Sequence, residues 1–422
     1  MRNIERRSFL QTLGTGVLGT AVLPAAAKNA IPGGGVFLSP SGSPDEQFWG
    51  LVKAQFPIAE GKIMVNAANL CPAPYVVGDE IIRHARALDT DVSFQHRARF
   101  ETIRKETLQA LANFLGVSAD EMGITRNTSE ANNMVIQGLD FQPGDEVVIW
   151  DQNHPSNNMA WKQKAKRFGL IIKEVRTPGA AASPEELLQP FEAAIGTKTR
   201  VIAFSHISNV SGQVIPAAAL CELARSRGVL TLIDGAQSFG MLNLNLQALG
   251  CDFYTSSSHK WLMGPKETGI LYVRQAHLER LWPTTMGAGW KEGDLSVDGR
   301  ICTLGQRNDA LAAAMTSALR FHDAIGRQNI EERVFELAVR LKTALLERVP
   351  GLELVSPEAD EATAGIVIVR HTTQDNNKLY EQLYHQYGIA CAPTGGLRFS
   401  PTIYNTPAEM DNIAESLRQL VS

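Results

Sequence analysis

The sequence contains few cysteines, and their spacing matches no common metal-binding or redox motif. Five cysteines are spread over 422 residues, and no two of them form a C-x-x-C pair. The usual zinc-binding and dithiol patterns are therefore excluded, and we predict no metal site. Free cysteines are among the most frequently buried side chains, so we predict buried thiols, with a disulfide as the alternative in an exported protein. The cysteines are Cys71, Cys221, Cys251, Cys302 and Cys391.

The chain also lacks an excess of charge of one sign, internal repeats and long apolar runs. Its 40 Lys and Arg residues face 44 Asp and Glu residues, and the formal net charge of -4 gives no reason to expect nucleic acid as a partner. No apolar run approaches the roughly 20 residues that cross a bilayer, so we expect no membrane span in the mature protein. A hydrophobic fraction of 44% over this length predicts a large core in two lobes.

The N-terminal segment has the pattern of an export signal. The arginine pair 6–7 precedes Ser-Phe-Leu, a weakly apolar run continues to Leu23, and three alanines end at Ala27. These features resemble a twin-arginine signal peptide, so we expect residues 1–27 to be removed, the twin-arginine translocase to be a partner and the mature protein to be periplasmic. A G-x-G-x-x-G pattern at 14–19 lies inside this apolar run, without the strand and helix that a dinucleotide site requires, and we reject it.

After a Gly- and Pro-rich stretch at 32–44, short apolar runs alternate with helical patterns. Continuous apolar runs are typical of strands buried on both faces, and the helices between them predict an α/β protein with a mostly parallel sheet. From about Asp309 the pattern changes to long helices and one further strand. We predict an N-terminal segment (28–75), a large domain (76–305) and a smaller α+β domain (306–422). The expected strands are 146–150, 170–175, 200–205, 229–233, 252–257 and 269–273, with helices at 101–115, 184–195 and 216–227.

Polar side chains stand at the carboxyl ends of four of these expected strands. Open α/β sheets bind their ligands at this edge, because the carboxyl ends of parallel strands meet there. A histidine, an asparagine, an aspartate and a lysine that converge on one sheet edge predict a cofactor site rather than separate solvated side chains. In chain order the residues are His154, Asn209, Asp234, His259 and Lys260.

These residue types match the chemistry of pyridoxal 5'-phosphate (PLP). The Lys260 amine would bond the PLP aldehyde, and Asp234 would keep the pyridine nitrogen protonated, so that the ring can accept electrons. His154 can stack on the flat ring, while Asn209 and Gln237 can donate hydrogen bonds to its phenolate oxygen. We therefore predict PLP as the cofactor, with Lys260, Asp234 and His154 as catalytic residues.

The PLP phosphate and a substrate carboxylate also have expected binding groups. Thr128 and Ser129 begin a helical pattern whose N–H groups and hydroxyls suit a phosphate, and Ser257 and His259 can reach the same group. Near the C-terminus, Arg398 can hold the carboxylate of an amino-acid substrate, because a guanidinium matches a carboxylate with two hydrogen bonds.

Together the motifs resemble those of the class V aminotransferases, PLP enzymes of fold type I. The resemblance runs through residues 60–405 and implies a large PLP-binding domain, a smaller C-terminal domain and a homodimer with each active site at the subunit interface. In that family a segment like 304–309 lends a phosphate contact to the neighbouring subunit through a threonine, whereas this chain has Gln306 there. The matching motifs are NTSEANN, HPSNN, HISNVSG, IDGAQS, DFYTSSSHKWLMGPKETGILYV and LRFSPTIYNT.

Two branches of the family are relevant to the reaction. Cysteine desulfurases carry a catalytic cysteine on a loop before the substrate arginine, but here that stretch is shorter and Cys391 falls on an expected strand, so we interpret Cys391 as structural. The C-terminal spacing instead resembles the isopenicillin N epimerase-like branch, which has an exported member that tailors the siderophore pyoverdine. That resemblance implies oxidative decarboxylation of the glutamate head group of a siderophore peptide precursor to a succinamide.

Other reactions stay open, because the sequence does not show which bond of a bound amino acid is aligned for cleavage. The alternatives are transamination or epimerisation of the siderophore glutamate or of a free amino acid, cysteine desulfuration, and a non-catalytic PLP-binding module. Asn69, in the turn NAANLCPAP, lies where such enzymes form the substrate pocket, and we interpret it as a candidate substrate-binding residue.

Overall fold

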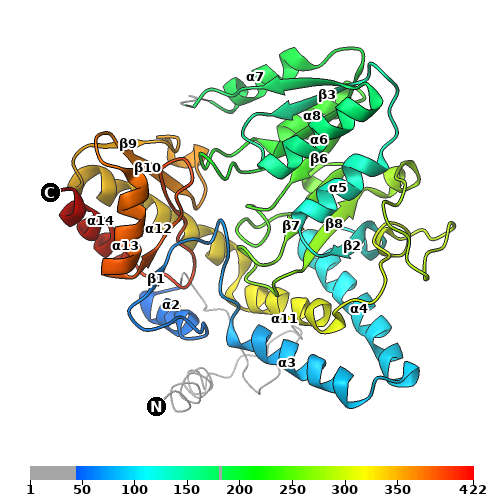
Figure 1. Ribbon diagram of the computed structural model, residues 1–422, viewed down its shortest axis with the longest axis horizontal. Helices are drawn as coiled ribbons and strands as arrows, with labels where there is room; N and C mark the ends of the chain where they lie inside the picture. Colours follow the sequence, from blue (N-terminus) through cyan, green and yellow to red (C-terminus); the bar gives the residue numbers. More distant parts are fainter. Residues whose placement is uncertain (1–43, 180–182) are drawn as a thin grey trace, which may run out of the picture.

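The computed structural model describes residues 44–179 and 183–422, and its largest sheet has seven strands (Figure 1). Strand β8 is antiparallel to both of its neighbours, and the other strand pairs are parallel. The predicted mostly parallel sheet is therefore confirmed. In sheet order the strands are β2 (Met122–Thr125), β8 (Gly269–Val273), β7 (Phe253–Ser257), β6 (Leu230–Asp234), β5 (Thr199–Ser205), β3 (Glu146–Trp150) and β4 (Ile171–Val175).

The central strands are buried on both faces, because successive side chains of a strand point to opposite sides of the sheet. In β3, Val148 and Trp150 belong to the hydrophobic cluster on one face, and Val147 and Ile149 belong to the cluster on the other. All four are fully buried, which explains why the strand is an unbroken apolar run in the sequence. Helices α7 (Pro184–Ala194) and α8 (Ala217–Ser226) cover the first face; α5 (Thr128–Gly138) and α6 (Pro155–Phe168) cover the second.

Three long helices pack together beside the first face of the sheet. They are α3 (Tyr75–Thr90), α4 (Phe94–Leu115) and α11 (Asp309–Ile325), and α11 contacts both of the others. Helix α4 begins earlier than the predicted helix 101–115, because Ser93 caps it by accepting a hydrogen bond of 3.2 Å from the His96 N–H. The predicted boundary between residues 305 and 306 precedes α11, which thus packs with helices of the large domain.

A smaller lobe contains an antiparallel sheet of β12 (Leu397–Phe399), β10 (Val367–His371) and β9 (Leu352–Leu354). Its core is shared by three helices, α12 (Arg327–Arg348), α13 (Asn376–Tyr387) and α14 (Pro407–Val421). Figure 1 shows this lobe at one side of the large sheet, joined to it through the long α11–α12 connection. The remaining short elements are α9 (Leu246–Leu249), α10 (Val297–Arg300), η1 (Ala119–Glu121), η2 (Gln275–Arg280) and η3 (Asp360–Ala362).

The N-terminal part of the described chain packs against the smaller lobe. Strand β1 (Ile63–Met64) pairs in parallel with β11 (Ile389–Ala390), and helix α2 (Glu46–Lys53) forms ion pairs with that lobe. Glu46 bonds the buried guanidinium of Arg333 in α12, and Lys53 pairs with Glu409 in α14. The segment that follows β1 is consequently held between the smaller lobe and the large sheet.

Some sequence predictions concern residues that the structure does not describe. The signal peptide 1–27, its cleavage near Ala27 and the start of the N-terminal segment 28–75 lie outside the described residues. Within 44–179 and 183–422, no helix is both long and apolar enough to cross a membrane. The five cysteines all lie within these ranges, and they are free and buried, which confirms the prediction of buried thiols.

Candidate active site

Lys260 lies just beyond the carboxyl end of β7, as the sequence predicts. Its side chain is partly buried, and this burial lowers the pKa of the amine to about 8. The carboxylate of Asp234 raises the pKa of the amine, and the guanidinium of Arg398 lowers it further. Both groups therefore lie close enough to influence the amine. A lysine with such a pKa reaches its neutral form, which attacks an aldehyde, much closer to physiological pH than an exposed lysine does.

The loop after Lys260 is closed by hydrogen bonds around Ser258. The Ser258 N–H donates to the Thr268 carbonyl at 3.0 Å, and the Ser258 hydroxyl donates to the Pro265 carbonyl at 2.9 Å. Two residues of the loop that are not glycine, Met263 and Glu267, have left-handed backbone angles, with φ of 56° and 61°. Such conformations persist only where the surrounding structure holds them, so Lys260 stands on a tightly fixed turn.

Asp234 ends β6 and is almost fully buried, with 3% of its surface exposed. Its Oδ2 accepts a hydrogen bond of 2.9 Å from the Asn132 amide, and its Oδ1 accepts one of 3.1 Å from the Ala236 N–H. Within the described residues it forms no ion pair, although the charge of Lys260 is close enough to influence it. A buried carboxylate that still has unshared lone pairs can accept a proton-bearing nitrogen, as the predicted role requires.

His154 caps the N-terminus of α6, in the short loop that follows β3. Its Nδ1 lies 2.8 Å from the Ser156 hydroxyl and also accepts the Ser156 N–H at 3.3 Å. Loss of hydration lowers the pKa of the ring; Asp234 opposes that shift, and the charges of Lys260 and Arg398 reinforce it. His154 is therefore neutral near pH 7, with its proton on Nε2, and presents a flat uncharged ring.

The start of α5 brings together the residues predicted for the phosphate. The Ser257 hydroxyl accepts the Thr128 N–H at 2.8 Å and lies 2.6 Å from the Thr128 hydroxyl. Ser129, the next residue, is exposed and donates to the Ser156 hydroxyl at 3.3 Å. His259 is partly buried, and burial together with the charges of Lys260 and Lys266 lowers its pKa to about 4. A helix start of this kind attracts a phosphate.

Gln237 and Asn209 are placed by contacts with other parts of the chain. The Gln237 amide donates to the Ala68 carbonyl at 2.9 Å and accepts the Trp261 indole N–H at 2.8 Å, which leaves one amide N–H of Gln237 for a ligand. Asn209 uses its backbone, because its carbonyl accepts the Arg398 guanidinium at 3.0 Å.

Arg398, in β12, is a buried cation that forms no ion pair within the described residues. Only 4% of its surface is exposed, and burial lowers its pKa to about 10. It donates to the Asn209 carbonyl and, at 3.3 Å, to Oδ1 of Asn66, while its Nε has no partner within the described chain. A buried guanidinium that lacks a carboxylate is costly, and the binding of an anionic ligand would offset the cost.

Sequence reasoning missed several residues that contact this site. Asn66 accepts a hydrogen bond from Arg398, while Asn69, which is exposed in the same turn, stays a predicted substrate-binding residue. Asn132 bonds Asp234, and Ser156 bonds His154. The motifs NTSEANN, HPSNN and NAANL contain these residues, but an asparagine or serine within a motif does not reveal which side chain it will face.

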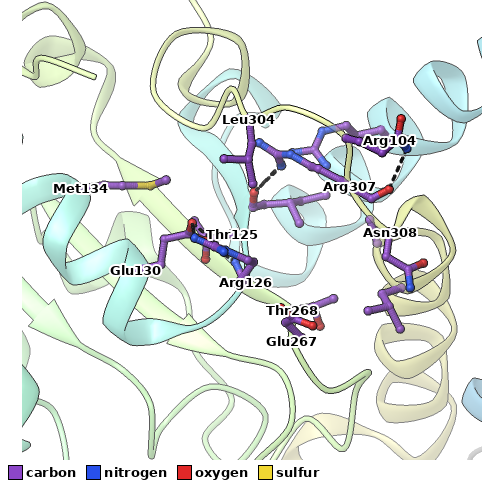
Figure 2. A pocket seen from close by; sticks show the side chains of 14 residues that line it. Arg104, Thr125, Arg126, Glu130, Met134, Glu267, Thr268, Leu304, Arg307 and Asn308 are labelled. Carbon is purple, nitrogen blue, oxygen red and sulfur yellow. Dashed lines mark hydrogen bonds and ion pairs between the residues drawn. The ribbon is translucent and has the colours of Figure 1, made fainter. Parts of the chain in front are cut away.

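A cavity of about 210 Å³ adjoins the start of α5 and is lined by Gln306 and Thr268 (Figure 2). Figure 2 shows Arg104 and Arg307 on one wall, facing Arg126 and Glu130 on the other. Gln306 accepts a hydrogen bond of 2.8 Å from Arg97 of its own chain, so its contribution to a neighbouring subunit stays a prediction.

The donor set of the site fits PLP. It comprises a partly buried amine, a buried carboxylate with free lone pairs, a hydroxyl-rich helix start, a neutral flat imidazole and an unmatched guanidinium. In chain order the predicted residues that meet there are Thr128, Ser129, His154, Asn209, Asp234, Gln237, Ser257, His259, Lys260 and Arg398.

Comparison with known proteins agrees with this arrangement. A family model described as aminotransferase class V matches residues 76–413. An isopenicillin N epimerase of Amycolatopsis lactamdurans is 29% identical over 393 residues, covering 88% of this chain and 98% of that protein. The Streptomyces clavuligerus isopenicillin N epimerase is 31% identical over 331 residues, covering 74% of this chain and 83% of that protein.

Cysteine desulfurases and a C-S lyase are also similar. An Escherichia coli cysteine desulfurase is 29% identical over 409 residues, covering 87% of this chain and 97% of that protein. The crystal structure of the E. coli cysteine desulfurase CsdA superposes with a TM-score of 0.77 at 23% identity, over 88% of this chain and 97% of that one. A mutant of the lyase C-DES with glycine covalently linked to PLP gives a TM-score of 0.79 at 23% identity, over 89% and 99%. These structures share the fold.

Proposed function

Because the chain belongs to the class V aminotransferase family and is a PLP-dependent enzyme of fold type I, we propose that it acts on the glutamate head group of a siderophore precursor in the periplasm. The observation that carries the substrate class is Arg398. Its buried guanidinium has no carboxylate partner in the described chain and shares the site with Lys260. An α-amino acid supplies both an amine for the PLP aldehyde and a carboxylate for Arg398.

The export signal supports the proposed compartment and the choice of a siderophore. The arginine pair 6–7 and the apolar run after it are the features of a twin-arginine signal. That route carries folded proteins, so an enzyme can be loaded with its phosphorylated cofactor before export. A periplasmic location favours a substrate that matures there over a free amino acid of central metabolism.

The proposed reaction is the oxidative decarboxylation of the glutamyl end to a succinamide. One amino acid end, R–CH(NH2)–COOH, reacts with one O2 and yields R–CO–NH2, CO2 and H2O. The bond between the α-carbon and the carboxyl carbon breaks, the α-carbon gains a bond to oxygen, and O2 is the oxidant. The amine nitrogen is kept, as the amide of the product.

When bound, PLP withdraws electrons from the α-carbon of an amino acid attached through its amine. Lys260, with a pKa lowered to about 8, would bond the cofactor aldehyde in the resting enzyme and would accept the proton that the substrate α-carbon loses. Asp234 would hold the ring nitrogen, and His154 would pack against the ring. Arg398 would bind the carboxylate and so would orient the bonds of the α-carbon.

Desulfuration is the least supported reaction of the related enzymes. A desulfurase needs a thiolate that reaches the substrate. All five cysteines of this chain are buried, and burial raises the pKa of each thiol, to about 12 for Cys391. Cys391 follows β11 with 3% of its surface exposed. Transamination and epimerisation use the same groups as the proposed reaction and are its alternatives.

The test is mass spectrometry of a glutamyl siderophore precursor incubated in air with the PLP-loaded protein. Loss of the elements of CH2O from the precursor is the expected result. Lys260→Ala should abolish it, while Lys266→Ala, a change of an exposed lysine in the same loop, should not. A keto acid product would establish an aminotransferase, and an inverted α-carbon without a mass change would establish an epimerase. An unaltered precursor would refute the siderophore substrate.

We also propose that two copies of the chain associate. Large apolar side chains are exposed at the α3–α4 turn, where Val92 and Phe94 are 71% and 84% exposed, and in the loop before α10, where Met286 and Leu295 are each 65% exposed. Exposed apolar groups of this size are typical of subunit contacts. Light scattering should give twice the mass of one chain, and Phe94→Glu should shift the protein towards the monomer; a monomeric wild type at micromolar concentration would contradict the proposal.

A further inference from the structure

Three buried polar side chains form a chain of hydrogen bonds that ends on the Asp234 carboxylate. The Thr255 hydroxyl donates to Oδ1 of Asn132 at 2.7 Å, and the Asn132 amide donates to Oδ2 of Asp234 at 2.9 Å. Thr255, Asn132 and Asp234 are 0%, 1% and 3% exposed, so bulk water does not compete for these bonds. Neither Asn132 nor Thr255 is among the site residues predicted from the sequence.

The fold itself brings these residues together. Asp234 of β6 and Thr255 of β7 are direct partners in the parallel ladder, so their side chains stand beside each other on the same face of the sheet. Asn132 comes from α5, which packs on β6 and β7, in the second turn after Thr128. Three separate elements thus fix this chain of hydrogen bonds from Thr255 through Asn132 to Asp234, which we call the relay. The helix that contributes Asn132 also carries, in its first turn, the hydroxyls predicted to bind the phosphate.

The direction of the hydrogen bonds follows from the chemistry of the groups. An ionised carboxylate only accepts hydrogen bonds, so Asn132 must present its NH2 group to Asp234. The carbonyl oxygen of Asn132 then faces Thr255, whose hydroxyl must donate to it. The second oxygen of Asp234 accepts the Ala236 N–H at 3.1 Å. Each oxygen of Asp234 therefore accepts a hydrogen bond from a fixed donor, and the two bonds together set the orientation of the carboxylate.

We propose that Asn132 and Thr255 are positioning residues that hold the Asp234 carboxylate turned towards the pyridine nitrogen of PLP. This inference rests on the proposed role of Asp234. Thr255 acts on Asp234 indirectly, through Asn132. Its hydroxyl prevents the Asn132 amide from turning its carbonyl oxygen towards the carboxylate. Without it, the amide can rotate, and two oxygens would face each other in a buried site.

The ring nitrogen provides a test that needs no substrate. PLP and 1-deaza-PLP, in which carbon replaces the ring nitrogen, both carry the aldehyde and the phosphate, but only PLP can bond Asp234. The dissociation constants of both compounds are measured for the cofactor-free protein by fluorescence titration. The ratio of the two constants reports the Asp234 contact alone, and Asp234→Ala gives the ratio expected when the contact is lost.

Thr255→Val keeps the shape of the side chain and removes its hydroxyl, so it should weaken PLP binding about tenfold while 1-deaza-PLP binding stays the same. Asn132→Leu should give the same pattern with a larger loss. Thr255→Ser restores the donor and should restore the ratio. The matched control is Thr231→Val, a buried threonine of β6 whose hydroxyl bonds Asp252 instead, and it should not alter the ratio.

Each other outcome overturns the inference. Equal losses for both compounds in Thr255→Val would show that the relay only supports the fold, and unchanged binding of both would show that it does nothing for Asp234. If Asn132→Leu fails to fold, the comparison of Thr255→Val with Thr255→Ser still tests the inference. A wild-type ratio equal to that of Asp234→Ala would refute the role of Asp234 itself, and the relay with it. None of these results depends on the identity of the substrate.

Discussion

Replacement of Arg398 by methionine should strongly weaken substrate binding without weakening the fold. Burial lowers the pKa of this guanidinium from its ordinary range to about 10, so the charged form is held at a cost. The gap between this pKa and that of an exposed arginine corresponds to roughly 3 kcal/mol of lost stability. Because the pKa falls on folding, the penalty is fully present below about pH 10 and is relieved only as the pH rises above it.

Methionine would remove this penalty together with two hydrogen bonds. The bonds join the guanidinium to the Asn209 carbonyl at 3.0 Å and to Oδ1 of Asn66 at 3.3 Å. Each contributes about 1 kcal/mol, so the free energy of unfolding should stay the same or rise by about 1 kcal/mol. The value of kcat/KM should instead fall about 100-fold or more, since a charge-assisted pair of hydrogen bonds to the substrate carboxylate is lost.

Chemical unfolding of the cofactor-free protein measures the first effect, and steady-state kinetics on the product measures the second. Arg333→Met is the matched control, because Arg333 is equally buried but pairs with Glu46 and Glu336. That variant should lose about 2 kcal/mol or more of stability and keep its activity. A loss of more than about 2 kcal/mol in Arg398→Met would refute the reasoning, since it would mean that the fold already compensates this charge.

Three further predictions concern protonation and reactivity. The rate at which cofactor-free protein bonds PLP should rise with pH through about 8, because the Lys260 amine must lose its proton; a rise centred near 10.5 would contradict the lowered pKa. Ser156→Ala should raise the pKa of His154, measured by NMR titration, because the neutral ring loses a hydrogen-bond donor to Nδ1; an unchanged pKa would remove Ser156 from the site. The native protein should leave all five thiols unreactive to a thiol reagent at pH 8 and expose them on unfolding, whereas rapid labelling of Cys391 would revive desulfuration.

Local sequence was enough to predict the sheet and one edge of it. The strand 146–150 was predicted at its observed bounds, because a strand buried on both faces must be apolar throughout. The positions of Asp234 and Lys260 followed from the same pattern, since residues directly after parallel strands meet at one edge of the sheet. The residue types at that edge then indicated PLP by their chemistry alone.

The contacts that orient these side chains could not be predicted in this way. The contact between Asn66 and Arg398 depends on β1 pairing with β11 and on the bridge between Asn66 and Ser400, which joins residues more than 300 positions apart. The antiparallel place of β8 between β2 and β7 is likewise a matter of topology, because an apolar run does not encode the direction of its neighbours.

The sequence by itself therefore determined which elements form and which chemical groups stand at their ends, because burial pattern and residue type act locally along the chain. Only the tertiary structure decided that no carboxylate of residues 44–179 and 183–422 pairs with the buried Arg398, and that Asn132 and Thr255 converge on Asp234. Both facts arise from packing between distant segments. Water is excluded there, so each missing hydrogen bond costs more free energy, and each completed one contributes more, than at the surface.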